Sequence, residues 1–386
     1  MRKVIPSAMA MGGSSTHPMS PATAPAGHQP PWNVGERWAD GPRYAARRIA
    51  LKVPIGKVAD VMTTPYGTFA QNSNQGTLLY NGNVLMAHRS GANNAPFIYN
   101  PGTNTLSNLP FTTVSGNAVQ LPDSTLLSLI AGAPGAIYDL THGRIRTLST
   151  TLPATVVFSR LSGWVFLLYI PGGSIYKYDV RDDLLTKMAS TWPASGFDYW
   201  PIVLQDGRVF IPPVTSTTGR VYDLAADYMR TTSCTFPNVG ANAFAGSCVL
   251  HTGEVFCSPR NSQIANIYDP LTDTVRTVSG FDNSGASYNY GVSCVLMPDG
   301  RVLIPPFALN GGYAKMYDPV TNTVSSTSML WPSPYGMSNA VCLQDGRIYC
   351  CPYNSTTARI YGSAAYSLPA ARLLPSLVTP GNSSLA

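Results

Sequence analysis

Short apolar runs separated by turn residues recur along most of this chain. In one unit, Ala340–Leu343 and Arg347–Cys351 are apolar runs joined by Asp345-Gly346, and a third run follows at Ala358–Tyr361. Asp-Gly between two such runs predicts a two-residue hairpin of type I′, whose central residues both have positive φ. Pro and Asn in Asp318–Asn322 predict a further turn before a strand rich in β-branched side chains. Each unit therefore predicts four antiparallel strands.

The unit repeats seven times with two anchors in phase. A tyrosine, usually followed by Asp, marks the third strand at Tyr99, Tyr138, Tyr178, Tyr222, Tyr268, Tyr317 and Tyr361. A tight turn precedes each tyrosine by 14 to 17 residues, as Asp206-Gly207 precedes Tyr222. Four-stranded units that recur at the spacing of these tyrosines are typical of propeller blades. We expect an all-β fold, a seven-bladed β-propeller over residues 67–370, with the four strands of each blade supplied largely by one repeat.

Residues Tyr317–Thr323 and Leu343–Tyr349 resemble a kelch repeat. The second strands end differently from the kelch pattern, in Pro212-Pro213, Ser258-Pro259, Pro305-Pro306 and Cys351-Pro352 rather than in a Gly-Gly pair. This divergent form resembles the kelch-like propellers in structural proteins of tailed bacteriophages. The resemblance implies a virion protein assembled in a host cytoplasm and present in several copies per particle.

The net charge of +6 lies almost entirely outside the repeats. Residues 1–60 hold eight Lys/Arg and three acids, whereas the remainder holds 17 basic and 16 acidic residues. A nearly neutral body argues against a nucleic-acid partner. No apolar stretch approaches the roughly 20 residues of a membrane span, and no signal peptide is recognised. We therefore expect neither membrane insertion nor secretion.

The N-terminal segment, residues 1–66, predicts a mostly irregular basic arm, and residues 371–386 predict a peripheral tail. Residues 14–33 are rich in Ser, Ala, Pro and Gly and cannot bury enough surface to order alone. The arm reads either as a linker with one edge strand or as an attachment element that orders on other tail or virion proteins. The residues expected to carry assembly are Arg43, Arg47, Arg48, Ile49, Leu51 and Val53.

Cysteines and histidines predict neither a metal nor a cofactor. Cys257 and Cys350 occupy the same repeat position as Ile211 and Ile304, which indicates core packing by unpaired thiols. Copper-binding kelch enzymes such as galactose oxidase need histidines that converge on one face. Outside the arm the repeat places His88, His142 and His251 in three different blades, with the last two in turns of the opposite face.

Aromatic residues suggest the remaining candidate site. Trp192, Phe236 and Trp331 occupy matching positions, with Leu109 and Leu152 as equivalents, so they predict packing between blades. Aromatic and polar residues that do not repeat lie in three connections between blades, on the face where propellers usually bind ligands. These candidate glycan-binding residues are Asp198, Tyr199, Trp200, Asp282, Asn283, Tyr288, Tyr290 and Tyr335. Aromatic faces beside Asp and Asn suit sugar rings.

Three functions remain open at this point. The first is a non-enzymatic tail fibre or tail-associated module that recognises a host-surface glycan. The second is a purely architectural collar, nozzle or head-decoration subunit. The third is an enzyme that acts on polysaccharide through the same aromatic face. No catalytic residues are assigned.

Overall fold

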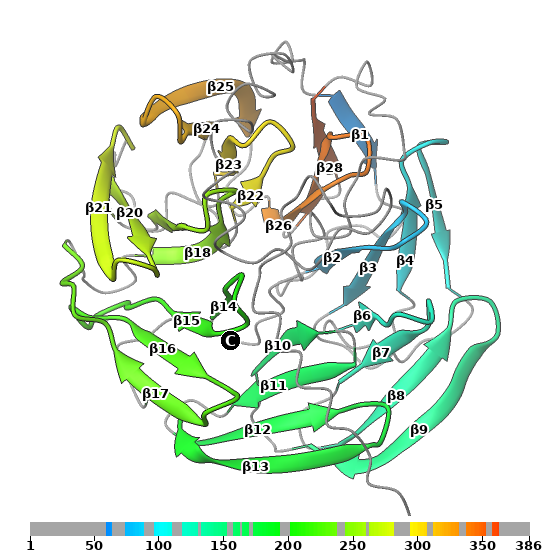
Figure 1. The fold of residues 1–386 in the computed structure, drawn as a ribbon. Coiled ribbons are helices and arrows are strands. Elements are labelled where there is room, and N and C mark those ends of the chain that lie inside the picture. The colour runs from blue at the N-terminus through cyan, green and yellow to red at the C-terminus, as the bar shows by residue number, and fades with distance from the viewer. Residues whose placement is uncertain are drawn as a thin grey trace, which may run out of the picture.

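The computed structural model describes residues 59–63, 74–88, 96–109, 118–129, 133–152, 157–162, 164–169, 173–193, 201–237, 244–259, 262–281, 294–306, 312–331, 337–352 and 357–362. Over these residues the chain forms seven four-stranded antiparallel sheets, arranged as the blades of a ring without helices (Figure 1). The predicted seven-bladed propeller is therefore confirmed. In this part of the chain no helix could cross a membrane.

The first six blades each take four consecutive strands, from the inside of the ring to its outer edge (Figure 1). Blades one and two comprise β2 (Asn74–Leu78), β3 (Val84–His88), β4 (Phe97–Asn100), β5 (Thr105–Asn108), β6 (Ala118–Gln120), β7 (Leu126–Ser128), β8 (Pro134–Asp139) and β9 (Gly143–Thr151). Blades three and four comprise β10 (Val157–Ser162), β11 (Val165–Tyr169), β12 (Ser174–Asp179), β13 (Leu184–Thr191), β14 (Ile202–Val203), β15 (Val209–Ile211), β16 (Arg220–Asp223) and β17 (Tyr228–Thr231). Blades five and six comprise β18 (Phe244–Val249), β19 (Val255–Pro259), β20 (Ile264–Asp269), β21 (Thr274–Ser279), β22 (Val295–Leu296), β23 (Val302–Ile304), β24 (Gly312–Asp318) and β25 (Thr323–Trp331).

The seventh blade joins the two ends of the repeat region. Its inner strands are β26 (Met337–Cys342), β27 (Ile348–Pro352) and β28 (Thr357–Tyr361), and its outer strand is β1 (Ala59–Thr63). In β1, Ala59 pairs with Ile360 and Thr63 with Thr357. The expectation that the whole arm lies outside the blades is therefore wrong for residues 59–63. The sequence pattern missed this strand because its partner lies some 300 residues away, whereas the alternation in the arm is at Ile49–Ile55.

The turns between first and second strands differ from the predicted type. In blade four, the N–H of Gly207 donates to the carbonyl of Leu204 at 3.1 Å, and the N–H of Leu204 donates to the carbonyl of Arg208 at 2.7 Å. Gly207 has a φ of 87°, but Asp206 does not have a positive φ. This is a type I turn followed by one left-handed residue, the usual three-residue hairpin loop. The same bonds recur at Gly82, Ser124, Gly253, Gly300 and Gly346.

The repeated aromatic residues form the core between blades. All seven anchor tyrosines are at most 1% exposed. Trp192 stacks on Tyr169 of its own blade, with ring centroids 3.7 Å apart, and lies in one cluster with Val209 and Tyr222 of blade four. Phe236, Leu109 and Leu152 are likewise buried in clusters that join two blades. Their predicted role in packing between blades is confirmed, while the side chain of Trp331 lies outside the described residues.

The cysteines pack as the repeat predicts. Cys257 and Cys350 are fully buried, as are Ile211 and Ile304 at the same position of other blades. The seven cysteines, all within the described part of the chain, form no disulfide bond. Burial raises the pKa of the Cys351 thiol to about 12. These thiols therefore act as small apolar side chains.

Candidate functional site

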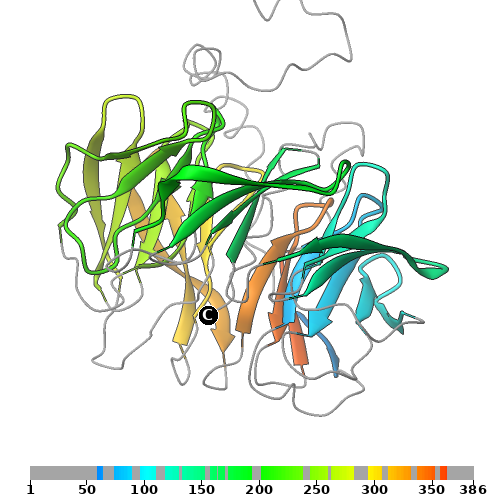
Figure 2. The ribbon, with the colours of Figure 1, turned by 90° about the horizontal axis from the view of Figure 1, so that it is seen from below.

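The two faces of the ring carry different kinds of connection. Strands cross the ring from one face to the other, as the side view in Figure 2 shows. Met337, at the start of β26, pairs with Pro352, at the end of β27, so first strands begin on the face where second strands end. We call this the connection face, because the segments between blades depart from it. The opposite turn face carries the turns that follow first and third strands.

The predicted ligand residues lie outside the described residues. Asp198, Tyr199 and Trp200 fall between β13 and β14; Asp282, Asn283, Tyr288 and Tyr290 fall between β21 and β22; and Tyr335 falls between β25 and β26. The arm residues Arg43, Arg47, Arg48, Ile49, Leu51 and Val53 also lie outside them. The strands that flank the three connections end and begin on the connection face. The proximity of the eight side chains stays a prediction.

The histidines follow the sequence prediction. The backbone of His88 ends β3 on the connection face, whereas His142 and His251 lie in turns of blades two and five on the turn face. His142 is exposed, and its Nδ1 lies 2.9 Å from Asp139 Oδ1. Among the described residues, no group of three or more His, Cys, Asp or Glu side chains is arranged to hold a metal ion.

A polar contact recurs where the third strand turns into the fourth. The buried hydroxyl of Tyr268 donates to Asp273 Oδ1 at 2.7 Å, and Asp273 has a φ of 54°. Asx residues with positive φ accept from the corresponding tyrosine in four other blades: Tyr99–Asn104, Tyr178–Asp183, Tyr222–Asp227 and Tyr317–Asn322. Asp and Asn tolerate the left-handed region better than other side chains with a Cβ. One residue thus forms the turn and satisfies a buried hydroxyl.

Four of these Asx side chains also bind the preceding blade, namely Asp183, Asp227, Asp273 and Asn322. Asp183 Oδ2 accepts from the hydroxyl of Ser149 at 2.6 Å, across from blade three to blade two. Asp273 Oδ2 accepts from the N–H of Ser233 at 2.8 Å and from Arg230 Nη1 at 3.0 Å, both in blade four. Burial opposes ionisation of Asp183 and Asp273, but these hydrogen bonds outweigh it and lower the pKa of each carboxyl to about 2. We call the Tyr–Asx pair with its bonds to the neighbouring blade the interblade clasp.

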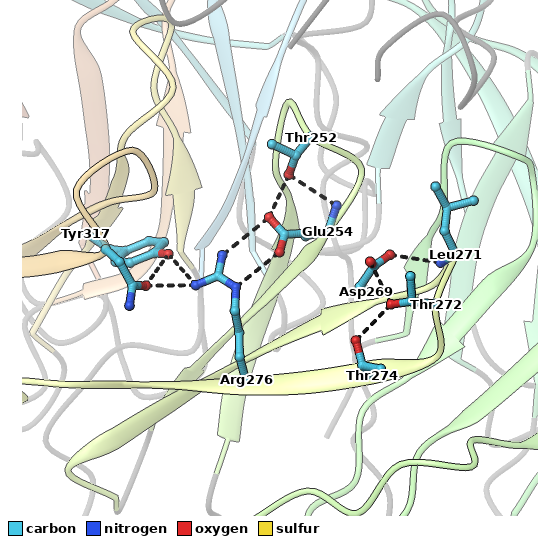
Figure 3. Close-up of polar contacts among 9 residues, drawn as sticks. Thr252, Glu254, Asp269, Leu271, Thr272, Thr274, Arg276 and Tyr317 are labelled. Carbon is cyan, nitrogen blue, oxygen red and sulfur yellow. Dashed lines mark hydrogen bonds and ion pairs between the residues drawn. The ribbon is translucent and has the colours of Figure 1, made fainter. Parts of the chain in front are cut away.

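Blades five and six share a variant of the clasp built on an arginine (Figure 3). Arg276, on β21, donates to Glu254 Oε1 at 3.1 Å within blade five and to Tyr317 OH at 3.2 Å in blade six. It also donates to Asn322 Oδ1 at 2.7 Å, so the neutral amide of blade six receives a cation where blade five has a carboxylate. The Thr252 hydroxyl orients Glu254 through a bond of 2.9 Å to Oε2. The ion pair therefore lies within blade five, and its arginine also bonds across the blade boundary to the neutral groups of Tyr317 and Asn322.

The Asp that directly follows the anchor tyrosine forms the turn itself. Asp269 Oδ1 accepts from the N–H of Leu271 at 2.9 Å, and Asp269 Oδ2 accepts from the hydroxyl of Thr272 at 2.8 Å (Figure 3). Asp139, Asp179, Asp223 and Asp318 accept N–H bonds in the same way. This Asp therefore caps the turn in five blades. The sequence reading missed the clasp residue five positions after the tyrosine, although Asn, Asp or Gly recurs there in six repeats.

Acidic residues gather on the turn face. Fourteen of the 16 Asp and Glu after residue 60 lie in its turns or next to them, namely Asp123, Asp139, Asp179, Asp182, Asp183, Asp206, Asp223, Asp227, Glu254, Asp269, Asp273, Asp299, Asp318 and Asp345. Three of these carboxylates bind an arginine two residues later: Asp206–Arg208, Asp299–Arg301 and Asp345–Arg347. The turn face is therefore the acidic face of a ring that is nearly neutral as a whole.

Comparisons with known proteins support the fold. Protein-family models and curated protein sequences gave no match. Among solved structures, the chain is similar to a streptogramin B lyase, with a TM-score of 0.61 and 9% identity over 79% of this chain and 97% of that chain. It is also similar to a fungal alcohol oxidase of the AA5 family in complex with copper (0.55, 14%, 80% and 76%) and to the WD40 β-propeller domain of Doa1 (0.55, 12%, 79% and 97%). At these identities the likeness establishes a β-propeller and no particular activity.

Proposed function

We propose that this protein is a non-enzymatic structural subunit of a tailed-phage particle, whose kelch-type propeller presents a glycan-binding face to the host surface. One observation carries the proposal: three connections with non-repeating aromatic residues are all flanked by strands that end on the same face. The repeated aromatic residues have packing roles in the core. Trp200, Tyr288, Tyr290 and Tyr335 do not repeat, and they come with acids and amides that can bind sugar hydroxyls.

The closed ring suits a module that must keep its shape at a cell surface. Every blade pairs its four strands internally, and the seventh is completed by β1, so the described sheets form a ring rather than an open row. The clasps then tie neighbouring blades at their outer turns. In this proposal, residues upstream of β1 join the particle and several copies present their connection faces together. Such multivalency compensates for weak single sites.

The test compares two aromatic losses on opposite faces. The variant combines Trp200→Ala with Tyr290→Ala on the connection face, and the matched control is Tyr80→Ala, an exposed tyrosine on the turn face. Each protein is biotinylated, assembled on streptavidin and measured for binding to a panel of bacterial cells and their purified surface polysaccharides. An aromatic contact contributes roughly 0.5–1.5 kcal/mol beyond its buried area. Two such losses should weaken each site about tenfold or more, whereas the control should bind like the parent.

The outcomes separate the three candidate functions. Binding to a polysaccharide that is lost in the double variant and kept in the control supports glycan recognition. Equal binding by both variants, with the ring still folded, contradicts it and favours the purely architectural subunit. Release of new reducing ends from the polysaccharide would instead identify an enzyme that acts on it.

A further inference from the structure

The first strands of neighbouring blades, which line the inside of the ring (Figure 1), meet at a recurring pair of repeat positions. The residue five positions before the left-handed turn residue of one blade contacts the residue six positions before that of the next blade. Thr77 of blade one donates its hydroxyl to the carbonyl of Ala118 of blade two at 3.1 Å. Val295 of blade six and Ala340 of blade seven lie in one buried cluster. The repeat therefore brings these two positions together at both boundaries.

The boundary between blades seven and one shows how closely the two positions approach. Gly76 stands there opposite Val341, and a Cβ added to Gly76 would lie 2.9 Å from Cγ2 of Val341. Cγ2 is one carbon–carbon bond from the Cβ of Val341, so the two β-carbon positions are no more than about 4.4 Å apart. Disulfides join Cβ atoms that are about 3.5–4.5 Å apart. Two cysteines at this pair of positions can therefore form a disulfide with little backbone movement.

Blades five and six have cysteines at both positions, as no other boundary does in the sequence. Cys248 lies in β18, and Cys294 directly precedes β22. Both belong to one buried cluster with Tyr317 of blade six. Their thiols are hydrogen-bonded to each other. Cys257, the other buried cysteine of blade five, belongs to the cluster shared with blade four and so lies on the opposite side of the sheet.

We propose that Cys248 and Cys294 are a peroxide-sensitive pair whose reversible disulfide ties blade five to blade six. Cys294 is 8% exposed and Cys248 is fully buried, so peroxide reaches Cys294 first. One oxygen atom passes from hydrogen peroxide to the Cys294 sulfur, which gives a sulfenic acid and one water. The Cys248 sulfur then attacks the Cys294 sulfur. The S–S bond forms, the S–O bond breaks, and the hydroxyl leaves as water with the Cys248 proton.

The disulfide would fix the end of one connection between blades. The connection from β21 to β22 holds Asp282, Asn283, Tyr288 and Tyr290 and ends at Cys294, so oxidation attaches that end to β18 of blade five. The closed loop also restricts the unfolded chain, which stabilises the folded ring. The hydrogen bond to Cys294 and burial raise the pKa of the Cys248 thiol, so this thiol stays protonated and unreactive until Cys294 is oxidised. This inference does not depend on a phage origin or on glycan binding.

The experiment maps disulfides in the full chain after oxidation. Reduced protein is treated with hydrogen peroxide in stepwise equivalents, blocked with N-ethylmaleimide while denatured, and digested with trypsin and an enzyme that cleaves after glutamate. The expected product joins residues 231–254, which hold Cys234 and Cys248, to residues 277–301, which hold Cys294. The thiol count should fall from seven to five, and dithiothreitol should restore it.

Single alanine variants identify the partners. Cys248→Ala should abolish the joined fragment, whereas Cys234→Ala and the matched control Cys257→Ala, an equally buried thiol of the same blade, should keep it. A joined fragment that persists in Cys248→Ala would overturn the proposal, and so would oxidation of Cys294 to a sulfinic acid without any joined fragment.

Unfolding in urea then tests whether the disulfide ties the two blades. The urea midpoint of the oxidised parent should exceed that of the reduced parent, and dithiothreitol should remove the difference. Cys248→Ala should show no such increase after peroxide treatment. An oxidised parent that carries the joined fragment but unfolds at the same or a lower urea concentration would contradict the role of the disulfide as a tie between blades.

Discussion

Replacing Asp273 tests whether the clasp stabilises the ring through three separable effects: the charge of the carboxylate, its hydrogen bonds and its left-handed backbone. Its carboxylate accepts from the buried Tyr268 hydroxyl, from Ser233 and from Arg230, and its backbone has a φ of 54°. Asp273→Asn keeps an acceptor and a tolerated backbone but removes the charge, which should cost about 1 kcal/mol. Asn322 supports this small value, since its amide accepts from both Tyr317 and Arg276 in blade six.

Replacing Asp273 by Gly or by Ala separates the loss of its hydrogen bonds from backbone strain. Asp273→Gly keeps the left-handed backbone and loses the charged hydrogen bonds, which should cost about 2–3 kcal/mol. Gly143 occupies the equivalent position of blade two with a φ of 87°, so the ring accommodates glycine there. Asp273→Ala loses the same bonds and adds about 1 kcal/mol for a Cβ in the left-handed region. It should therefore be the least stable of the three.

The assay is equilibrium unfolding in urea, followed by circular dichroism and tryptophan fluorescence on the full chain. The expected order of stability is parent, Asn, Gly, Ala, with Asp182→Ala as a surface control within about 0.5 kcal/mol of the parent. An alanine variant as stable as the glycine variant would refute the backbone argument. An asparagine variant as unstable as the alanine variant would refute the view that a neutral acceptor suffices.

Three further predictions follow from the clasp, the closing strand and the buried thiols. Because the pKa of Asp183 and of Asp273 is about 2 in the folded ring and about 3.9 when unfolded, their stabilisation is complete above about pH 5. This stabilisation should disappear as the pH falls toward 2, so the urea midpoint should fall with the pH. Asp273→Asn should make the midpoint depend less steeply on pH, because the amide does not titrate. Deleting residues 1–63 should lower the urea midpoint and promote aggregation through the exposed edge of β28, whereas deleting residues 1–57, which keeps β1, should leave a stable monomer on gel filtration. Cys257→Ser should cost about 2 kcal/mol by burying a hydroxyl among apolar side chains, Cys257→Ala should cost less, and a thiol reagent should count seven thiols in the parent only after denaturation.

Local repetition made the ring predictable, and distant pairing made its closure unpredictable. The Tyr and Asp-Gly anchors recur within single repeats, so they predicted seven four-stranded units in phase with one another. The turn type was wrong because Asp-Gly alone does not distinguish a two-residue loop from a type I turn followed by glycine; the number of residues with positive φ decides between them. β1 has only five residues, and its partner β28 begins almost 300 residues later along the chain, so no neighbouring pattern could identify the pair. The eight candidate ligand residues follow no repeat, and for that reason neither the periodicity nor the packing fixes their positions.

The closing strand also determines how mechanical load enters the ring. A pull carried along the backbone upstream of β1 enters this strand at Ala59, its first residue. A pull along the strand axis stretches all the β1–β28 hydrogen bonds at once, in shear, whereas a pull across the axis breaks them one after another, as in unzipping. Shear resists far greater force than unzipping, because the bonds must fail together. An N-terminal segment pulled along the axis of β1 therefore stays attached at high force. The same segment pulled across that axis separates β1 from β28 at low force.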